Sequence, residues 1–292
     1  MTDYKIGYVI LHYLTYDVTI ECVEKVLNQL GKNDVIVIVD NGSHNKTGIK
    51  LFNKFKEYKN VHTILNDKNL GFAKGNNLGF KYLKDNYDID LIVMINNDVL
   101  IEQVNWRNQL ISIYNKEYFD LLGPEILDIK RNHTECNPQN PIHTTYHRVK
   151  FAKFMNDLKY LMSYVGLDTI IEKISNSATK NKETKIINKK SIKYNVQLAG
   201  CCWIFGKRYI DMFDGINPDT FLYLEEQILF YRIQSNNMKS MYSPFLEVVH
   251  LEDISTNALF KGKSSKRRFK YKCQRKSFDV LLNEIKKTPK KG

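Results

Sequence analysis

Long apolar runs and a leader are both missing from this sequence. It has no run of about 18 apolar residues, the length that a membrane-spanning helix needs. The N-terminus enters a strand-like run almost at once, without the basic start and small-residue cleavage site of a signal peptide. We therefore expect a cytoplasmic protein without a membrane-spanning helix.

Several common sequence fingerprints are missing as well. The five cysteines include no CxxC pair and no zinc-ligand spacing, which indicates reduced thiols in a cytosolic protein. The dinucleotide fingerprint GxGxxG and the P-loop GxxxxGK[ST] are both absent. Hydride transfer and P-loop kinase chemistry therefore lose their main support.

Acidic residues are scarce near the C-terminus. Residues 261–292 hold 13 Lys and Arg against Asp279 and Glu284, so they account for +11 of the net charge of +12. The preceding residues are near neutral, and we expect residues 257–292 to form a basic tail. Such a tail suits anionic lipid head groups or nucleic acid.

Buried strands alternate with helical patterns over the first hundred residues. Apolar runs occur at 6–11, 35–39 and 91–95, residues 61–65 are expected to form a short strand, and residues 20–30 carry apolar side chains at helical spacing. Strands that are buried on both faces and joined by helices form parallel sheets. The sequence therefore predicts an α/β fold with a mostly parallel central sheet and helices on both faces.

Polar residues follow each of these four expected strands. They are His12 and Tyr13, residues 40–43, residues 66–69, and residues 96–98. Turns alone favour Asn, Asp and Gly. The carboxyl ends of parallel strands, however, meet at one edge of the sheet, where ligands bind. Four polar clusters at that edge predict a binding site.

The pattern loosens between residues 128 and 195, where we expect a variable, partly helical insertion in a main domain of residues 1–256. Residues 151–165 have the apolar spacing of an amphipathic helix, with lysines at other positions. This helix either packs on the main domain or lies on a membrane surface and holds a lipid-linked acceptor. Residues 180–193 are polar and lysine-rich, which predicts a loop.

The sheet-edge residues suit a nucleotide. Asp40 can accept a hydrogen bond from a base or a ribose hydroxyl. Gly71 and the other glycines of residues 69–79 let the backbone approach a ligand, next to the positive N-terminus of a helix. Asp98 is a hard oxygen ligand for Mg²⁺ or Mn²⁺, which would offset the charge of a diphosphate.

Two carboxylates, Glu225 and Glu226, interrupt the apolar segment 220–233. A buried carboxylate is costly unless it has a partner or a function. One interpretation is a general base that takes the proton of an attacking hydroxyl. The alternative is an acidic pair that is favoured by the dipole at a helix N-terminus.

Taken in order, these segments resemble family 2 glycosyltransferases of the GT-A fold, close to the bacterial rhamnosyltransferase-like branch. The resemblance rests on VILHY (9–13), VDNGS (39–43), NLGFAKGNNLG (69–79), INND (95–98), LAGCCWIFGKR (198–208), FLYLEEQILFYR (221–232) and VVH (248–250). It implies an inverting enzyme that moves a sugar from a nucleotide-diphosphate donor, such as dTDP-rhamnose or a UDP-hexose, to a hydroxyl. The acceptor would be a glycan, lipid-linked, in cell-surface polysaccharide synthesis at the inner face of the plasma membrane.

The resemblance also implies residue roles. Glu226 matches the catalytic base, with Glu225 as the alternative. Asp98 matches the metal ligand of a D-x-D motif, and His250 matches a histidine near the metal, although a lone histidine is often structural. Trp203 would stack on a sugar of the acceptor or pack in the core. We expect the nucleotide to lie against His12, Tyr13, Asp40, Asn69, Gly71, Asn76, Asn96 and Asn97.

Two positions depart from the family pattern. Asn96 replaces the first aspartate of D-x-D, so a metal would depend on Asp98 and the donor phosphates. In the E-D-x-D segment Glu226 replaces an aspartate, and Ile228 replaces the last one. These changes leave open a non-catalytic sugar-nucleotide binder, and the basic tail leaves open a nucleic-acid-binding protein. The near-neutral body and the sheet-edge carboxylates favour the enzyme, because without a metal these carboxylates would repel a phosphate backbone.

Overall fold

The computed structural model describes residues 4–128, 137–139, 141, 145–169, 191–251 and 262–287. Most of the loop expected at 180–193 lies outside these residues. So does the expected boundary between residues 256 and 257.

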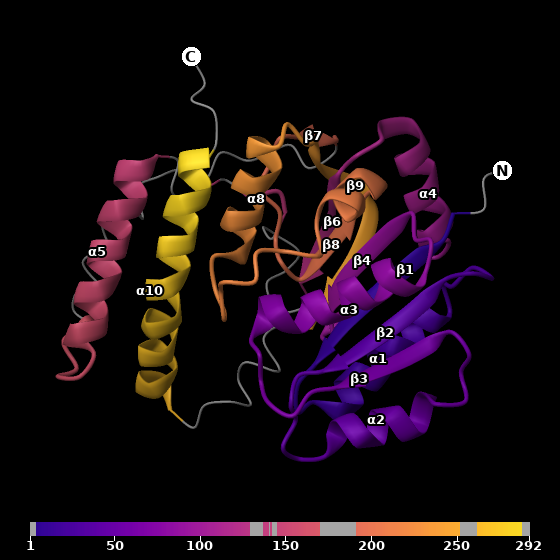
Figure 1. Cartoon of the computed structure of the whole chain (residues 1–292), viewed down its shortest axis with the longest axis horizontal. Coiled ribbons are helices and arrows are strands. Elements are labelled where there is room, and N and C mark those ends of the chain that lie inside the picture. The colour runs from indigo at the N-terminus through magenta and orange to yellow at the C-terminus, as the bar shows by residue number, and fades with distance from the viewer. Residues whose placement is uncertain are drawn as a thin grey trace.

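The first half of the chain forms the parallel part of the sheet. The strands are β1 (Ile6–His12), β2 (Val35–Asp40), β3 (Val61–Leu65) and β4 (Leu91–Asn96), in the order β3-β2-β1-β4. Helices α1 (Tyr16–Leu27), α2 (Thr47–Phe55) and α3 (Phe72–Asn86) connect them. The parallel register places His12 beside Asp40 and Leu11 beside Asn96. The predicted strand-end clusters therefore meet at one edge (Figure 1).

The second half extends the same sheet with mixed directions. Strand β8 (Cys202–Phe205) pairs antiparallel with β4, and it is followed by β6 (Leu121–Asp128), β9 (Ser240–His250) and β5 (Val99–Leu100). The short β7 (Lys193–Tyr194) pairs with β9, so the described residues form one nine-stranded sheet. Helices α4 (Trp106–Glu117), α7 (Lys207–Met212) and α8 (Glu225–Ser235) complete this part.

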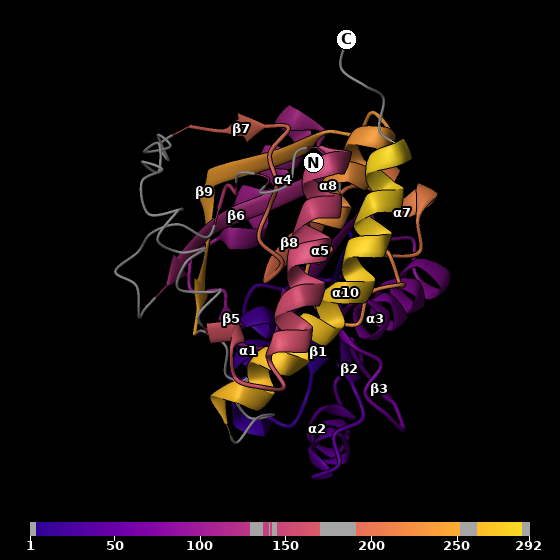
Figure 2. The ribbon, with the colours of Figure 1, turned by 90° about the vertical axis from the view of Figure 1, so that its left-hand side faces the viewer.

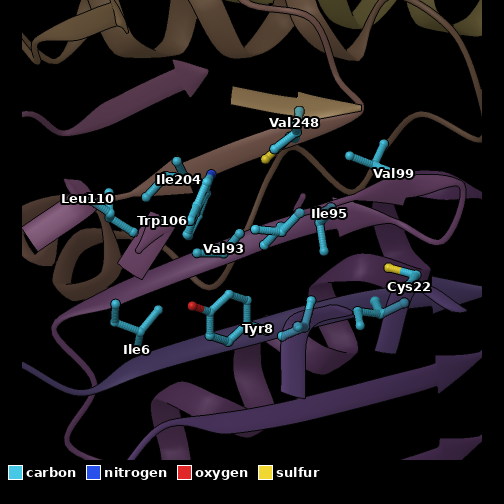
Figure 3. Packing of buried hydrophobic residues seen from close by; sticks show 14 of the residues in the cluster. Ile6, Tyr8, Cys22, Val93, Ile95, Val99, Trp106, Leu110, Ile204 and Val248 are labelled. Atoms are coloured by element: carbon cyan, nitrogen blue, oxygen red, sulfur yellow. The ribbon is translucent and has the colours of Figure 1, made fainter. Parts of the chain in front are cut away.

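Helices cover both faces of the sheet, as predicted. Side chains of α1, α2 and α4 pack on one face, where Tyr8, Cys22, Val93 and Trp106 share a core (Figure 3). Side chains of α3, α7 and α8 pack on the other face around Phe80 and Phe205. Each fully buried large apolar side chain contributes roughly 1.5–3 kcal/mol. These two cores hold the strand ends, and with them the site, in fixed positions.

The expected basic tail is instead largely a packed helix. Helix α10 (Lys263–Lys287) buries Tyr271, Phe278 and Leu281, and it lies beside α5 (Tyr146–Met162) and α8 (Figures 1 and 2). Its apolar residues are buried because they recur at helical spacing between the lysines. The Nδ2 of Asn156, on α5, donates to the backbone oxygen of Tyr271 at 3.0 Å.

Helix α5 packs along one side and exposes apolar side chains on another. It buries Val149 against α10 and α8, whereas Phe151 and Phe154 are 65% and 62% exposed. None of the helices in the described part of the chain is long and apolar enough to span a bilayer.

Candidate functional site

A cavity of about 820 Å³ lies at the carboxyl ends of the parallel strands. It joins residues that are far apart in the sequence. Residues from the strand ends line it together with the segment 221–226 and one face of α10. The polar and charged side chains in its lining are Tyr13, Asn41, Asn69, Asn96, Asn97, Asp98, Gln139, Tyr223, Glu225, Glu226, His250, Lys266, Lys270 and Gln274.

Asn41 organises the turn that precedes α3. Its Nδ2 donates to the Oδ1 of Asn69 and to the backbone oxygen of Gly71, both at 3.1 Å, and its Oδ1 accepts from the Leu70 N–H at 2.9 Å. The sequence prediction did not select Asn41 as a site residue, although it stands within the VDNGS segment. An amide suits this position because it donates and accepts at once.

Gly71 allows this turn to meet the segment before α8. Its φ is +84°, and a Cβ there would lie 2.4 Å from the backbone oxygen of Phe221. The N–H of Phe72 donates to that same oxygen at 2.7 Å. The close approach brings the predicted nucleotide turn and the predicted base segment into one cavity.

Three predicted nucleotide residues support the strand ends from behind and are not in the cavity lining. His12 is fully buried between the hydroxyls of Thr19 and Thr47, and burial lowers its pKa to about 4, so its ring is neutral. The carboxylate of Asp40 accepts from the Ser43 N–H at 3.2 Å, and burial raises its pKa. Asn76 donates to the backbone oxygen of Phe72 at 3.0 Å. The described contacts of all three are with the protein itself.

Asn97 and Asp98, which follow β4, both line the cavity and are both nearly buried. Asn97 is 4% exposed and donates to the hydroxyls of Thr15 and Thr19, at 2.8 Å each, which fixes the start of α1 against β4. Asp98 is held near His250, because β5 pairs Val99 with His250. The His250 Nε2 lies 3.5 Å from the Asp98 Oδ1.

These residues fit a divalent cation only as a partial ligand set. The described residues contain no group of three His, Cys, Asp or Glu side chains that could hold a metal ion. Mg²⁺ is commonly held by one or two carboxylates together with substrate phosphates and water. Asp98, His250 and the amide oxygen of Asn96 would supply the protein's share of such a set.

The two glutamates lie where helix α8 begins. The preceding residues Tyr223 and Leu224 have φ values of 77° and 70°, which place both in the left-handed region. Such backbone strain costs on the order of 1–3 kcal/mol per residue and is concentrated at functional sites. The described segment thus turns sharply to bring Glu225 and Glu226 into the cavity.

Glu225 and Glu226 differ in their surroundings. Burial, and then the Glu226 carboxylate, raise the pKa of Glu225 to about 8, and its Oε1 has no hydrogen-bond partner among the described residues. Burial also raises the pKa of Glu226, but hydrogen bonds from backbone N–H groups, including that of Gly200, oppose this. At neutral pH, Glu225 therefore holds its proton, and Glu226 has the donors that stabilise a carboxylate.

Trp203 does not reach the cavity. It is fully buried, packs edge-on against Phe72 with ring centroids 6.2 Å apart, and its Nε1 donates to the Leu198 oxygen at 3.4 Å. Trp203 is therefore a core residue, and the alternative in which it stacks on a sugar is not supported. Its ring lies in the core that α3, α7 and α8 form on one face of the sheet.

The sequence prediction missed the wall that α10 contributes. Lys266, Phe269, Lys270 and Gln274 line the cavity from this helix. Their spacing of three, four and eight residues is the signal that could have indicated a shared helix face. The sequence analysis did not use this spacing, because it interpreted the same residues as part of a uniformly basic tail.

Comparisons with known proteins agree with this geometry. The chain is 19% identical over 218 residues to the low-salt glycan biosynthesis hexosyltransferase Agl10 of Haloferax volcanii, covering 75% of this chain and 59% of that protein. A structure of GalNAc-T7 with UDP, GalNAc and Mn²⁺ has a TM-score of 0.55 at 12% identity, covering 86% of this chain and 43% of GalNAc-T7. A structure of S. aureus TarS residues 1–349 has a TM-score of 0.50 at 12% identity, covering 82% of this chain and 60% of that one.

This chain therefore spans less than two thirds of each of these proteins. The family model of glycosyl transferase family 2 matches residues 8–202, which include the strand ends and the glycine turn of the cavity. The chain has the GT-A fold and belongs to glycosyl transferase family 2.

Proposed function

We propose that the cavity transfers a sugar, with inversion, from a nucleotide-diphosphate donor to a hydroxyl of a glycan acceptor. The observation that carries this proposal is one cavity that joins Asn69 and Asp98 to Glu225 and Glu226. The donor would be dTDP-rhamnose or a UDP-hexose, and the product would enter cell-surface polysaccharide. The end of the cavity with Asn69 and Asp98 suits a nucleotide diphosphate, and the end with Glu225 and Glu226 suits an attacking hydroxyl.

In this proposal Glu226 is the general base. It takes the proton of the acceptor hydroxyl as that oxygen forms a bond to the anomeric carbon of the donor sugar. The bond from that carbon to the diphosphate oxygen breaks on the opposite face, and its electron pair leaves with the nucleoside diphosphate. Attack opposite the leaving group inverts the configuration. The Gly200 N–H holds Glu226 in place, and a side chain at Gly200 would crowd it, with a Cβ 2.9 Å from its Oε1.

Asp98, His250 and Asn96 would hold Mg²⁺ or Mn²⁺ against the donor diphosphate. The ion would supply positive charge to the leaving group. Asn69 and Gly71 line the same cavity at the N-terminus of α3, where the helix dipole favours the negative charge of a phosphate.

Nucleotide binding tests the donor end directly. We expect UDP or dTDP to raise the thermal midpoint in the presence of Mn²⁺, because a ligand of the folded state stabilises that state. Asp98→Asn should remove the metal-dependent part of this shift. Asp219→Asn is a matched control, because Asp219 is exposed and absent from the cavity lining. No shift with any nucleotide or nucleotide sugar would contradict the proposed donor end.

We also propose that the protein works at the inner face of the plasma membrane on a lipid-linked acceptor. On and just after α5, Phe151, Phe154, Leu161 and Val165 are 62–69% exposed and recur at helical spacing. Arg148 and Lys150 are exposed on the same helix. An apolar stripe beside basic residues suits an anionic lipid surface.

Vesicle flotation tests this membrane proposal. The full chain should float with phosphatidylglycerol vesicles and less with phosphatidylcholine vesicles, and the double variant Phe151→Ser/Phe154→Ser should bind about tenfold less. Ile49→Ser/Phe52→Ser on α2 is the control, because these residues are 51% and 43% exposed elsewhere in the fold. Equal binding of both double variants would refute the role of α5.

A further inference from the structure

The α10 wall of the cavity carries two lysines. Lys266 and Lys270 line the cavity together with Phe269 and Gln274. They are four residues apart, so they occupy one face of the helix on successive turns. The family relationship covers residues 8–202 and therefore gives no account of this wall.

Contacts join α10 to the segment 221–224, which leads into the two glutamates. Phe269 packs edge-on against Phe221 with ring centroids 6.1 Å apart, and the Ser277 hydroxyl donates to the Leu222 oxygen at 3.4 Å. The Lys270 Nζ lies 6.0 Å from the centroid of the Tyr223 ring. Since this segment leads directly into Glu225, Lys270 belongs to the base end of the cavity, and Lys266 lines the same cavity one helix turn away.

Other cationic residues of α10 bind the α5 region instead. Arg267 pairs with Asp168 at 2.8 Å, and Arg275 pairs with Asp157 at 2.8 Å. Arg268 lies 4.4 Å from the centroid of the Tyr164 ring. These contacts attach α10 to α5 and its following turn, whereas Lys266 and Lys270 are in the cavity lining.

We infer that Lys266 and Lys270 bind an anionic group of the acceptor. This inference rests on the proposed function, because the attacking hydroxyl must reach the base and the rest of the acceptor then extends along this end of the cavity. Two ammonium groups on adjacent helix turns suit a phosphate or a carboxylate. The acceptor would carry either the diphosphate of a lipid carrier or the carboxylate of an acidic sugar next to its reacting sugar.

Titration calorimetry on the full chain tests the inference with three probes. They are geranyl diphosphate, methyl glucuronide and the neutral geraniol, each added after a nucleoside diphosphate and Mn²⁺ have filled the donor end. We expect one anionic probe to bind and Lys266→Gln/Lys270→Gln to weaken it by about tenfold. The probe that binds identifies the source of the anion. Lys272→Gln/Lys276→Gln, which changes two exposed lysines outside the cavity lining, should stay within about twofold of wild type.

Three outcomes would overturn the inference. They are equal affinity of both double variants for the anionic probes, binding of geraniol as tight as that of geranyl diphosphate, and an equal loss of nucleotide affinity in Lys266→Gln/Lys270→Gln. The last would assign the lysines to the donor. If the wild type binds no nucleotide, the proposed function fails separately. Titration of geranyl diphosphate without nucleotide then still tests the lysines.

Discussion

Glu226→Gln is the most direct test of the chemistry. The amide keeps the size of the side chain, and its oxygen can still accept from the Gly200 N–H, so the fold and substrate binding should persist. It cannot take a proton from the acceptor hydroxyl. Loss of a general base typically costs 10²–10⁴-fold in rate, or about 3–5 kcal/mol in activation free energy. We therefore expect kcat to fall by that factor with little change in donor affinity.

Glu225→Gln is the matched control for this experiment. It is the same substitution at the adjacent residue, in the same cavity. Because the pKa of Glu225 is raised to about 8, its side chain is protonated at pH 7, and a neutral amide resembles it closely. We expect kcat at pH 7 to remain within about threefold of wild type, a loss of less than 1 kcal/mol.

The activity of both variants is measured as release of nucleoside diphosphate. The donor is the nucleotide sugar identified by thermal shift, and bacterial envelope lipid supplies the acceptor. The wild-type rate should rise with pH through the raised pKa of Glu226, because only the carboxylate accepts a proton. Full activity of Glu226→Gln together with loss of activity in Glu225→Gln would assign the base to Glu225. Wild-type rates in both variants would refute carboxylate catalysis, and absence of release in the wild type would favour the non-catalytic binder.

Three further predictions concern stability. The folded protein holds the Glu225 proton up to about pH 8, whereas the unfolded chain releases it near 4.5. This group therefore lowers the unfolding free energy as pH rises between these values, by at most about 5 kcal/mol. In urea unfolding, Glu225→Gln should remove most of this pH dependence, and an unchanged pH dependence would refute the raised pKa. Gly71→Ala should lower stability by at least about 1–3 kcal/mol, since its φ is +84° and the new Cβ would meet the Phe221 oxygen at 2.4 Å; an unchanged thermal midpoint would show that the turn adapts. Arg107→Met leaves the fully buried Asp34 side chain without its cation, so we expect urea unfolding to show a loss of about 3–5 kcal/mol in unfolding free energy. A loss below about 1 kcal/mol would show that the Ile6 and Gly31 N–H groups are enough to stabilise the Asp34 carboxylate.

The α/β architecture could be predicted from sequence because its signals are local. The runs at 6–11, 35–39 and 91–95 are apolar throughout, and a strand that is buried on both faces requires that pattern. The strand-end rule then placed Tyr13, Asn69 and Asp98 at one cavity, because parallel strands end at the same edge.

What could not be predicted depends on packing between distant segments. Trp203 is an aromatic residue that could stack on a sugar, and only the packing of α3, α7 and α8 on its face of the sheet shows that it is enclosed. Asn97 lines the cavity, and only the packing shows that its Nδ2 also donates to Thr15 and Thr19. The basic C-terminal segment gave no sign of its contacts, since the surface that it covers comes from α5 and α8.

The two ends of the cavity come from separate stretches of the chain. Most of the residues proposed for the donor lie between Tyr13 and Asp98, whereas those proposed for the acceptor lie between Glu225 and Gln274, with His250 as the exception that reaches back to Asp98. Substitutions or segment exchanges in the later stretch could therefore change which acceptor is glycosylated while the choice of nucleotide is preserved. For protein engineering, this arrangement makes α10 the natural region to diversify and the parallel strand ends the region to keep.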